Sequence, residues 1–188
     1  MDHFIYKNGA LHAEDVAIAD IAAAVGAPFY VYSAATLTRH YQLFTEALSP
    51  LPHQVCFAIK SLSNLAVLKL LGDLGAGMDV VSGGEYRRAK AAGVPGSRIV
   101  FSGVGKTREE MRLALGGGVR QFNLESEPEM RVLSEVAVSM GLVAPVTVRV
   151  NPDVDAKTHE KIATGKSENK FGIPIARAAE VYAEIAQL

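Results

Sequence analysis

A repeat that begins at Gln54 constrains the fold of this chain more than any other feature of its sequence. Each unit consists of an apolar strand-like segment, a small polar loop, a helix that opens at a capping residue, and a glycine. Strands that alternate with helices in this way predict a parallel sheet with right-handed crossovers, either an open doubly wound sheet or a closed barrel. The strand-like segments are residues 55–59, 78–81, 99–101, 121–124 and 146–150.

The number of units is small for a closed barrel. About five units are visible, whereas a full eight-stranded barrel typically needs about 250 residues. The sequence has 188 residues, and residues 174–188 form an apolar-rich predicted helix with no capping glycine. We therefore expect the chain to be the front part of a longer protein or a truncated form of one.

Three of the predicted helices open with the pattern of a capping box. In such a box a hydroxyl accepts a hydrogen bond from the backbone N–H three residues on, while a carboxylate reaches back. These residues therefore have a structural task available, which must be weighed against any catalytic one. The pairs are Ser82 with Glu85, Thr107 with Glu110, and Ser126 with Glu129.

The first strand of the repeat, residues 56–60, is an apolar run that stops on Lys60. In parallel α/β folds the carboxyl ends of the strands are where chemistry is done, so Lys60 is a candidate amine nucleophile. The alternative is an ordinary solvated lysine at the end of a strand.

Two further charged residues lie in predicted strands. Arg149 interrupts the apolar segment 146–150, where a buried charge without a partner would be costly, so we expect an anionic partner from the protein or from a cofactor. Asp79 lies in the strand that follows that of Lys60, and an aspartate near a lysine could tune its protonation. A buried ion pair with a purely structural role is the alternative for both.

Composition favours chemistry on small molecules. The formal net charge of −1 and 21% charged residues provide no basic face for nucleic acid. No apolar run approaches the length that spans a membrane. The single cysteine, Cys56, lies in an apolar strand as a small core residue and fits a reducing compartment, so we expect a cytoplasmic protein.

A nucleotide site and a metal site have little support. Residues 102–107, which include Lys106, follow a strand and open a helix, as a phosphate-binding P-loop does, but Val100 stands where that motif requires glycine. A P-loop nucleotide binder remains the alternative on this loop. His159 has no second histidine or cysteine at ligand spacing, so no metal site is predicted.

Residues 1–33 differ in character from the repeat. Aromatic, strand-like pieces at 4–6 and 29–32 flank a helical stretch at 16–25, which predicts a separate small β element. Residues 34–48 carry apolar side chains at helical spacing and predict an amphipathic helix.

Several segments, in the right order and over most of the chain, resemble the diaminopimelate decarboxylases. These are pyridoxal-phosphate enzymes of the alanine racemase-like class, also called group IV decarboxylases. The chain departs slightly from the family pattern at residues 61–62. The matching segments are residues 56–60, 63–68, 75–85, 101–107, 122–127, 149–155, 158–159 and 170–173.

The resemblance implies an α/β fold, a TIM-type (β/α) barrel that binds pyridoxal phosphate and is incomplete here. Residues 1–33 would associate with a β domain, residues 34–188 would form the front part of the barrel, and the remainder of the barrel and the C-terminal β domain would be absent. Lys60 would form the Schiff base with pyridoxal phosphate. Asp79, Glu85 and Arg149 match positions near the cofactor, with Glu85 doubling as a helix cap.

By the same resemblance, the full-length protein would be a homodimer that decarboxylates meso-2,6-diaminopimelate to L-lysine. The family's phosphate loop, pyridine-nitrogen partner and partner-subunit cysteine come later in the chain than residue 188, so we expect these residues alone to be inactive. Two alternatives stay open: a decarboxylase of another basic amino acid or polyamine precursor, and a non-catalytic fragment that pairs with a complementary half.

Overall fold

The computed structural model describes residues 2–152 and 171–188. Its centre is a five-stranded parallel sheet in which each strand is hydrogen-bonded to its neighbour in the sequence. The strands are β4 (Cys56–Ala58), β5 (Gly77–Val80), β6 (Ile99–Phe101), β7 (Gln121–Leu124) and β8 (Val146–Val148).

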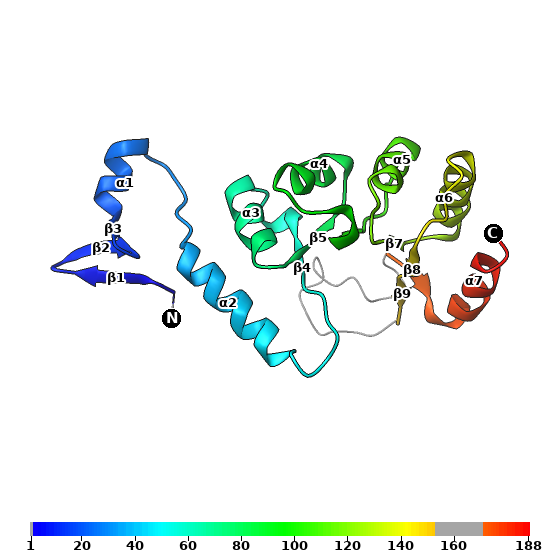
Figure 1. The fold of residues 1–188 in the computed structure, drawn as a ribbon, viewed down its shortest axis with the longest axis horizontal. Coiled ribbons are helices and arrows are strands. Elements are labelled where there is room, and N and C mark those ends of the chain that lie inside the picture. The colour runs from blue at the N-terminus through cyan, green and yellow to red at the C-terminus, as the bar shows by residue number, and fades with distance from the viewer. Residues whose placement is uncertain (1, 153–170) are drawn as a thin grey trace.

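The helices that connect these strands follow one another along one side of the sheet (Figure 1). They are α3 (Leu65–Asp73), α4 (Gly83–Ala91), α5 (Arg108–Gly116) and α6 (Glu127–Ser139). Strands in chain order with helices on one side form the wall of a (β/α) barrel, whereas a doubly wound sheet carries helices on both faces. The repeat is compatible with an open doubly wound sheet or with a barrel, and this arrangement shows that the fold is the barrel.

The wall continues beyond β8. Strand β9 (Val150–Asn151) pairs in parallel with β10 (Ile173–Pro174). A 3-10 turn, η3 (Ile175–Arg177), then leads into α7 (Ala178–Ile185). The described residues therefore form a partial barrel, as predicted.

Alternation along the strands separates the core from the barrel interior. In β5, Met78 and Val80 are fully buried, whereas Asp79 between them lines a cavity on the other side. In β7, Phe122 is buried in the same core, and Asn123 lines the cavity. Since successive side chains of a strand point to opposite faces, the apolar set packs under the helices and the polar set faces inward.

The predicted strand boundaries are confirmed at β6 and β7, and the other three differ. The strand expected at 78–81 lies one residue earlier, at Gly77–Val80. The strand expected to reach residue 59 ends at Ala58, because pairing with β5 stops at Asp79 and the chain turns into a 3-10 helix, η1 (Ile59–Ser61). Lys60 therefore lies in this turn just beyond the strand. The strand expected at 146–150 is divided at Arg149 into β8 and β9.

The three predicted capping boxes form in two versions. Thr107 and Glu110 make the reciprocal pair at the start of α5. At α4 and α6 the serine hydroxyl accepts from the N–H three residues on, but the carboxylate reaches one residue further back than in the standard box. Glu85 thus accepts a hydrogen bond from the Val81 N–H at 2.8 Å.

Residues before 34 form a separate element, as predicted. Strands β1 (Phe4–Lys7), β2 (Ala10–Ala13) and β3 (Val16–Ala17) make an antiparallel sheet, followed by α1 (Ile18–Val25). This element stands apart from the barrel wall, and α2 (Ala34–Ala47) lies between them (Figure 1). The prediction of a strand at 29–32 is wrong: aromatic residues favour strands, but in the described part of the chain this piece has no pairing partner.

Glu14 joins this element to α2, and we expect the contact to depend on pH. The Ala35 N–H and then the Ser33 hydroxyl donate to its carboxylate, and both hold the pKa of Glu14 below its usual range. The contact is therefore present above the pKa that Glu14 has in the unfolded chain, and it is lost as the pH falls through the lowered folded pKa. The chemical shift of the Ala35 amide should titrate with an acidic midpoint, and Glu14→Gln should remove the titration. A midpoint at or above the usual glutamate range would contradict this assignment.

Gly96 allows the turn before β6 to pack against the loop after α5. A Cβ at this position would lie 2.0 Å from the Gly117 carbonyl oxygen, which is backbone and cannot move aside. We expect Gly96→Ala to lower the free energy of unfolding by about 1–3 kcal/mol or more, the usual cost of overpacking. Gly116→Ala is the matched control, because its Cβ would meet only an ordinary contact at 3.6 Å. Equal urea midpoints for the two variants would show that the close packing at Gly96 is unimportant.

Candidate active site

A cavity of about 750 Å³ opens at the carboxyl ends of the parallel strands. Much of its polar lining lies directly after strands, as Lys60, Ser102 and Glu125 do, which is where parallel barrels place their chemistry. Three of the four sequence-predicted site residues line it: Lys60, Asp79 and Arg149. The other lining residues that the argument uses are Ser102, Asn123 and Glu125.

Lys60 has the only lysine ammonium on this cavity among the described residues. Its side chain is exposed, and within residues 2–152 and 171–188 it makes no hydrogen bond or ion pair. The turn that carries it is held by the Ser61 hydroxyl, which donates to the Ala58 carbonyl oxygen at 2.7 Å. A free amine on a fixed turn at the mouth of a cavity is available as a nucleophile.

Cys56, on the strand before Lys60, is not a competing nucleophile. Burial raises the pKa of its thiol, and the nearby Asp79 carboxylate raises that pKa further. A thiol with a raised pKa is inert at neutral pH, so Cys56 acts as a small packing residue, as the sequence predicts.

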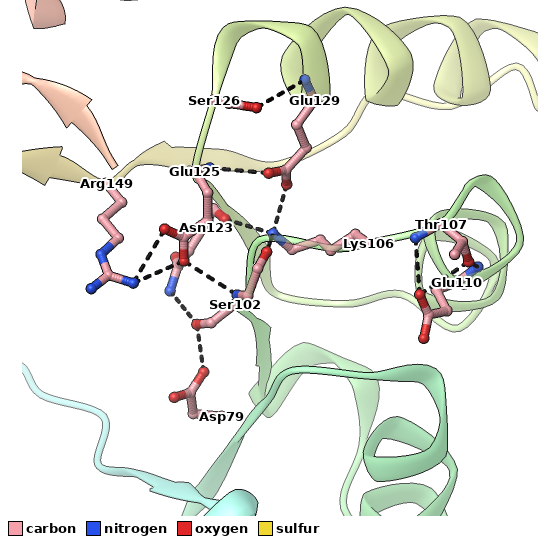
Figure 2. Close-up of polar contacts among 11 residues, drawn as sticks. Asp79, Ser102, Lys106, Thr107, Glu110, Asn123, Glu125, Ser126, Glu129 and Arg149 are labelled. Carbon is pink, nitrogen blue, oxygen red and sulfur yellow. Dashed lines mark hydrogen bonds and ion pairs between the residues drawn. The ribbon is translucent and has the colours of Figure 1, made fainter. Parts of the chain in front are cut away.

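A row of hydrogen bonds runs from β7 through Ser102, directly after β6, to Asp79 in β5 (Figure 2). The Gln121 amide donates to the Asn123 side-chain oxygen at 2.8 Å, and the Asn123 amide donates to the Ser102 hydroxyl at 2.8 Å. The Ser102 hydroxyl in turn donates to Asp79 Oδ1 at 2.6 Å. The Asp79 carboxylate is therefore held on one side by a defined donor.

Arg149 has the anionic partner that the sequence requires, and it comes from the protein. One guanidinium nitrogen lies 3.0 and 3.2 Å from the two carboxylate oxygens of Glu125. The side chain of Glu125 is only 2% exposed, whereas that of Arg149 is 39% exposed. The guanidinium also lies over the Phe171 ring, 5.1 Å from its centroid. This pair places a half-exposed cation on the cavity wall.

Lys106 lies beneath this wall, and its side chain is fully buried. Its ammonium donates to the carbonyl oxygens of Gly103 and Asn123, each at 2.8 Å, and to Glu129 at 2.6 Å (Figure 2). All three of its donors are used within the protein, so it cannot hold a phosphate as a P-loop lysine does. The nucleotide-binding alternative is therefore wrong.

Glu85 does not line the cavity. Its carboxylate is used to hold the N–H of Val81 at the start of α4, which is the capping role that the sequence predicts. A part in cofactor binding stays a prediction for this residue. His159 lies outside the described residues.

Sequence reasoning missed Ser102, Asn123, Glu125 and the buried pair of Lys106 with Glu129 as parts of the site. A signal was present for one of them, Asn123. Gln121 and Asn123 alternate with apolar residues in β7, and a polar residue at every second position of a barrel strand points inward. The remaining four could be found only once the strands were aligned.

Two classes of feature are missing from the described part of the chain. No helix in residues 2–152 and 171–188 has the length and apolar character needed to cross a membrane. No group of three or more potential ligands in the same residues could hold a metal ion.

Comparison with known proteins defines the class of this chain. Residues 34–188 match the family of pyridoxal-dependent decarboxylases, specifically their pyridoxal binding domain, so the chain belongs to this family. The match begins at the first residue of α2.

Several proteins that are similar to this chain are diaminopimelate decarboxylases. That of Pseudomonas fluorescens is 56% identical over all of this chain and 45% of its own length. The crystal structure of the M. jannaschii enzyme superimposes with a TM-score of 0.91 at 35% identity, covering 100% of this chain and 45% of that one. The Helicobacter pylori enzyme, complexed with L-lysine, gives 0.84 at 39% identity, covering 88% and 42%. The chain thus spans less than half the length of these relatives.

Proposed function

We propose that this chain is the N-terminal part of a diaminopimelate decarboxylase, which converts meso-2,6-diaminopimelate to L-lysine with pyridoxal phosphate. The observation that carries the proposal is the free ammonium of Lys60 on a cavity at the carboxyl ends of barrel strands, in a chain of the pyridoxal binding family. The named relatives and the L-lysine bound to the Helicobacter pylori enzyme support the substrate.

The residues present fit pyridoxal phosphate. An aldehyde needs an amine that is not already paired, and Lys60 provides one. When bound, the cofactor supplies an electron sink for the electrons that remain on the α-carbon after carbon dioxide leaves.

The other side chains of the cavity would orient the ring and balance charge. Asp79 presents a carboxylate fixed on one side by Ser102, which would face a cationic group of the cofactor or substrate. Arg149, held by Glu125, presents a half-exposed cation to an anionic group. Diaminopimelate carries both kinds of charge, so a wall with both signs suits it.

The cofactor assignment can be tested on the full-length protein by incubation with pyridoxal phosphate, reduction with borohydride and peptide mapping. We expect the label on Lys60. Label on another lysine, with Lys60 unmodified, would overturn the assignment. The reduction also leaves a stable mass increase, so the result does not depend on turnover.

The substrate can be tested separately with a panel of amino acids. We expect release of L-lysine from meso-diaminopimelate, and little reaction with lysine, ornithine or arginine. Preference for one of these would retain the cofactor and change the substrate. Residues 1–188 alone should show no turnover, because the chain covers less than half of each relative.

We infer further that residues 1–33 associate with a β domain, that residues 34–188 form the front of the barrel, and that the full-length enzyme is a cytoplasmic homodimer. The separate antiparallel sheet before α2 supports the association of residues 1–33 with a β domain. The free thiol of Cys56 supports a cytoplasmic location. Light scattering of the full-length protein tests the dimer: a monomeric mass would count against it.

A further inference from the structure

The row from Gln121 to Asp79 has a direction that is imposed by chemistry. An ionised carboxylate only accepts hydrogen bonds, and a hydroxyl has a single hydrogen to give. The Ser102 hydrogen is directed to Asp79 at 2.6 Å, so its oxygen must accept from the Asn123 amide. The opposite orientation of the Asn123 amide would place two acceptors on one hydroxyl hydrogen. The direction of the whole row therefore follows from the bond that Asp79 accepts from Ser102.

The row also fixes the orientation of Asp79. The three hydrogen bonds of the row join residues of β7, the residue directly after β6, and β5, so the donor to Asp79 Oδ1 is positioned by the sheet itself. Donors that point the same way polarise one another, and a hydrogen bond to a charged acceptor is stronger than one between neutral groups. Asp79 lines the same cavity as Lys60, so a carboxylate held in this way presents its charge in one place.

The charged and titratable groups around Asp79 come from the strands on both sides of β5. Cys56 and Lys60 lie on β4 and the turn that follows it. Glu125 and Arg149 lie at the ends of β7 and β8 and are paired with each other. Among the described residues, Ser102 makes the hydrogen bond that Asp79 receives.

We propose that Ser102, oriented by Asn123, is a positioning residue that holds the Asp79 carboxylate in one orientation toward the place where Lys60 would meet the cofactor. This proposal rests on the proposed function, because it assumes pyridoxal phosphate at Lys60. Ser102 need not touch the reacting atoms: it acts through Asp79.

The test is a double-mutant cycle on the full-length protein, with the dissociation constant of pyridoxal phosphate as the readout. Ser102→Ala should weaken binding about tenfold, the scale of one hydrogen bond to a charged group. Asp79→Asn should weaken it at least as much. In the Asp79→Asn background, Ser102→Ala should add less than about twofold, because the charge through which Ser102 acts is already gone.

Controls separate this role from a merely structural one. Ser97→Ala, at an exposed serine of the turn before β6, should leave cofactor binding unchanged. The thermal midpoint of cofactor-free Ser102→Ala should stay close to that of the wild type, and Ser102→Thr, which keeps the hydroxyl, should restore part of the affinity.

The outcomes distinguish two failures. Wild-type binding in Ser102→Ala, or an undiminished effect of Ser102→Ala in the Asp79→Asn background, overturns the positioning role and leaves the proposed function intact. A wild-type protein that binds no pyridoxal phosphate at Lys60 overturns the proposed function and this inference together.

Discussion

Replacement of Lys60 by alanine in the full-length protein is expected to reduce decarboxylation by at least about 10³-fold, the scale on which removal of a nucleophile acts. Within the described residues, the cavity holds no second lysine that could take its place, because Lys106 lies beneath the wall with all its donors engaged. Measurement of kcat for L-lysine release, together with borohydride labelling, checks the prediction.

Lys90→Ala is the matched control. Lys90 is exposed on α4 and lies outside the cavity lining, so the same change of side chain there should leave kcat within about twofold of the wild type, as for an ordinary surface substitution. Added methylamine should partly restore the Lys60→Ala variant, since a small amine can occupy the vacated space. Full activity in Lys60→Ala would exclude this residue as the anchor of the cofactor.

The sequence alone predicts the strands, the capping serines and the position of Lys60 because these depend on neighbouring residues. Strands β6 and β7 begin and end where the predicted strand-like segments do. The identity of the fold required more: sequential strand order is a property of pairing, and the repeat is compatible with either a barrel or an open sheet. The strand order β4-β5-β6-β7-β8, with helices on one side, decides for the barrel.

The partners of buried charged residues are what the sequence alone predicts least well. The need of Arg149 for an anion follows from its place in an apolar strand, but Glu125 becomes its partner only through the pairing of β7 with β8. Lys106 is the opposite case. Its local sequence points to a phosphate loop, yet its ammonium is bound to Glu129, 23 residues later, on α6. Local spacing carries no information on which of these two anions the lysine meets.

The pair of Lys106 and Glu129 leads to the second large effect. The two side chains are 0% and 8% exposed, and Glu129 also accepts the N–H of Glu125, so the pair holds the base of the cavity wall. Lys106→Met keeps an unbranched side chain but leaves a buried carboxylate and two carbonyl oxygens without their donor. We expect the free energy of unfolding to fall by about 3–5 kcal/mol, the usual cost of breaking a buried ion pair from one side.

The cost should arise from the uncompensated charge more than from the loss of attraction. Lys106→Met combined with Glu129→Gln removes both charges, and we expect it to be more stable than Lys106→Met alone. Lys69→Met is the matched control, because Lys69 pairs with Asp73 on the surface of α3, where the side chains are 64% and 62% exposed. That exposed pair is worth less than about 1 kcal/mol. Urea unfolding of the three variants and the wild type measures the free energy of unfolding of each. Similar losses for Lys106→Met and Lys69→Met would contradict a special role for the buried pair.

Loss of Lys106 should also affect the cavity. Since Glu129 holds Glu125, and Glu125 holds Arg149, Lys106→Met should loosen the cation that the cavity presents to its ligands.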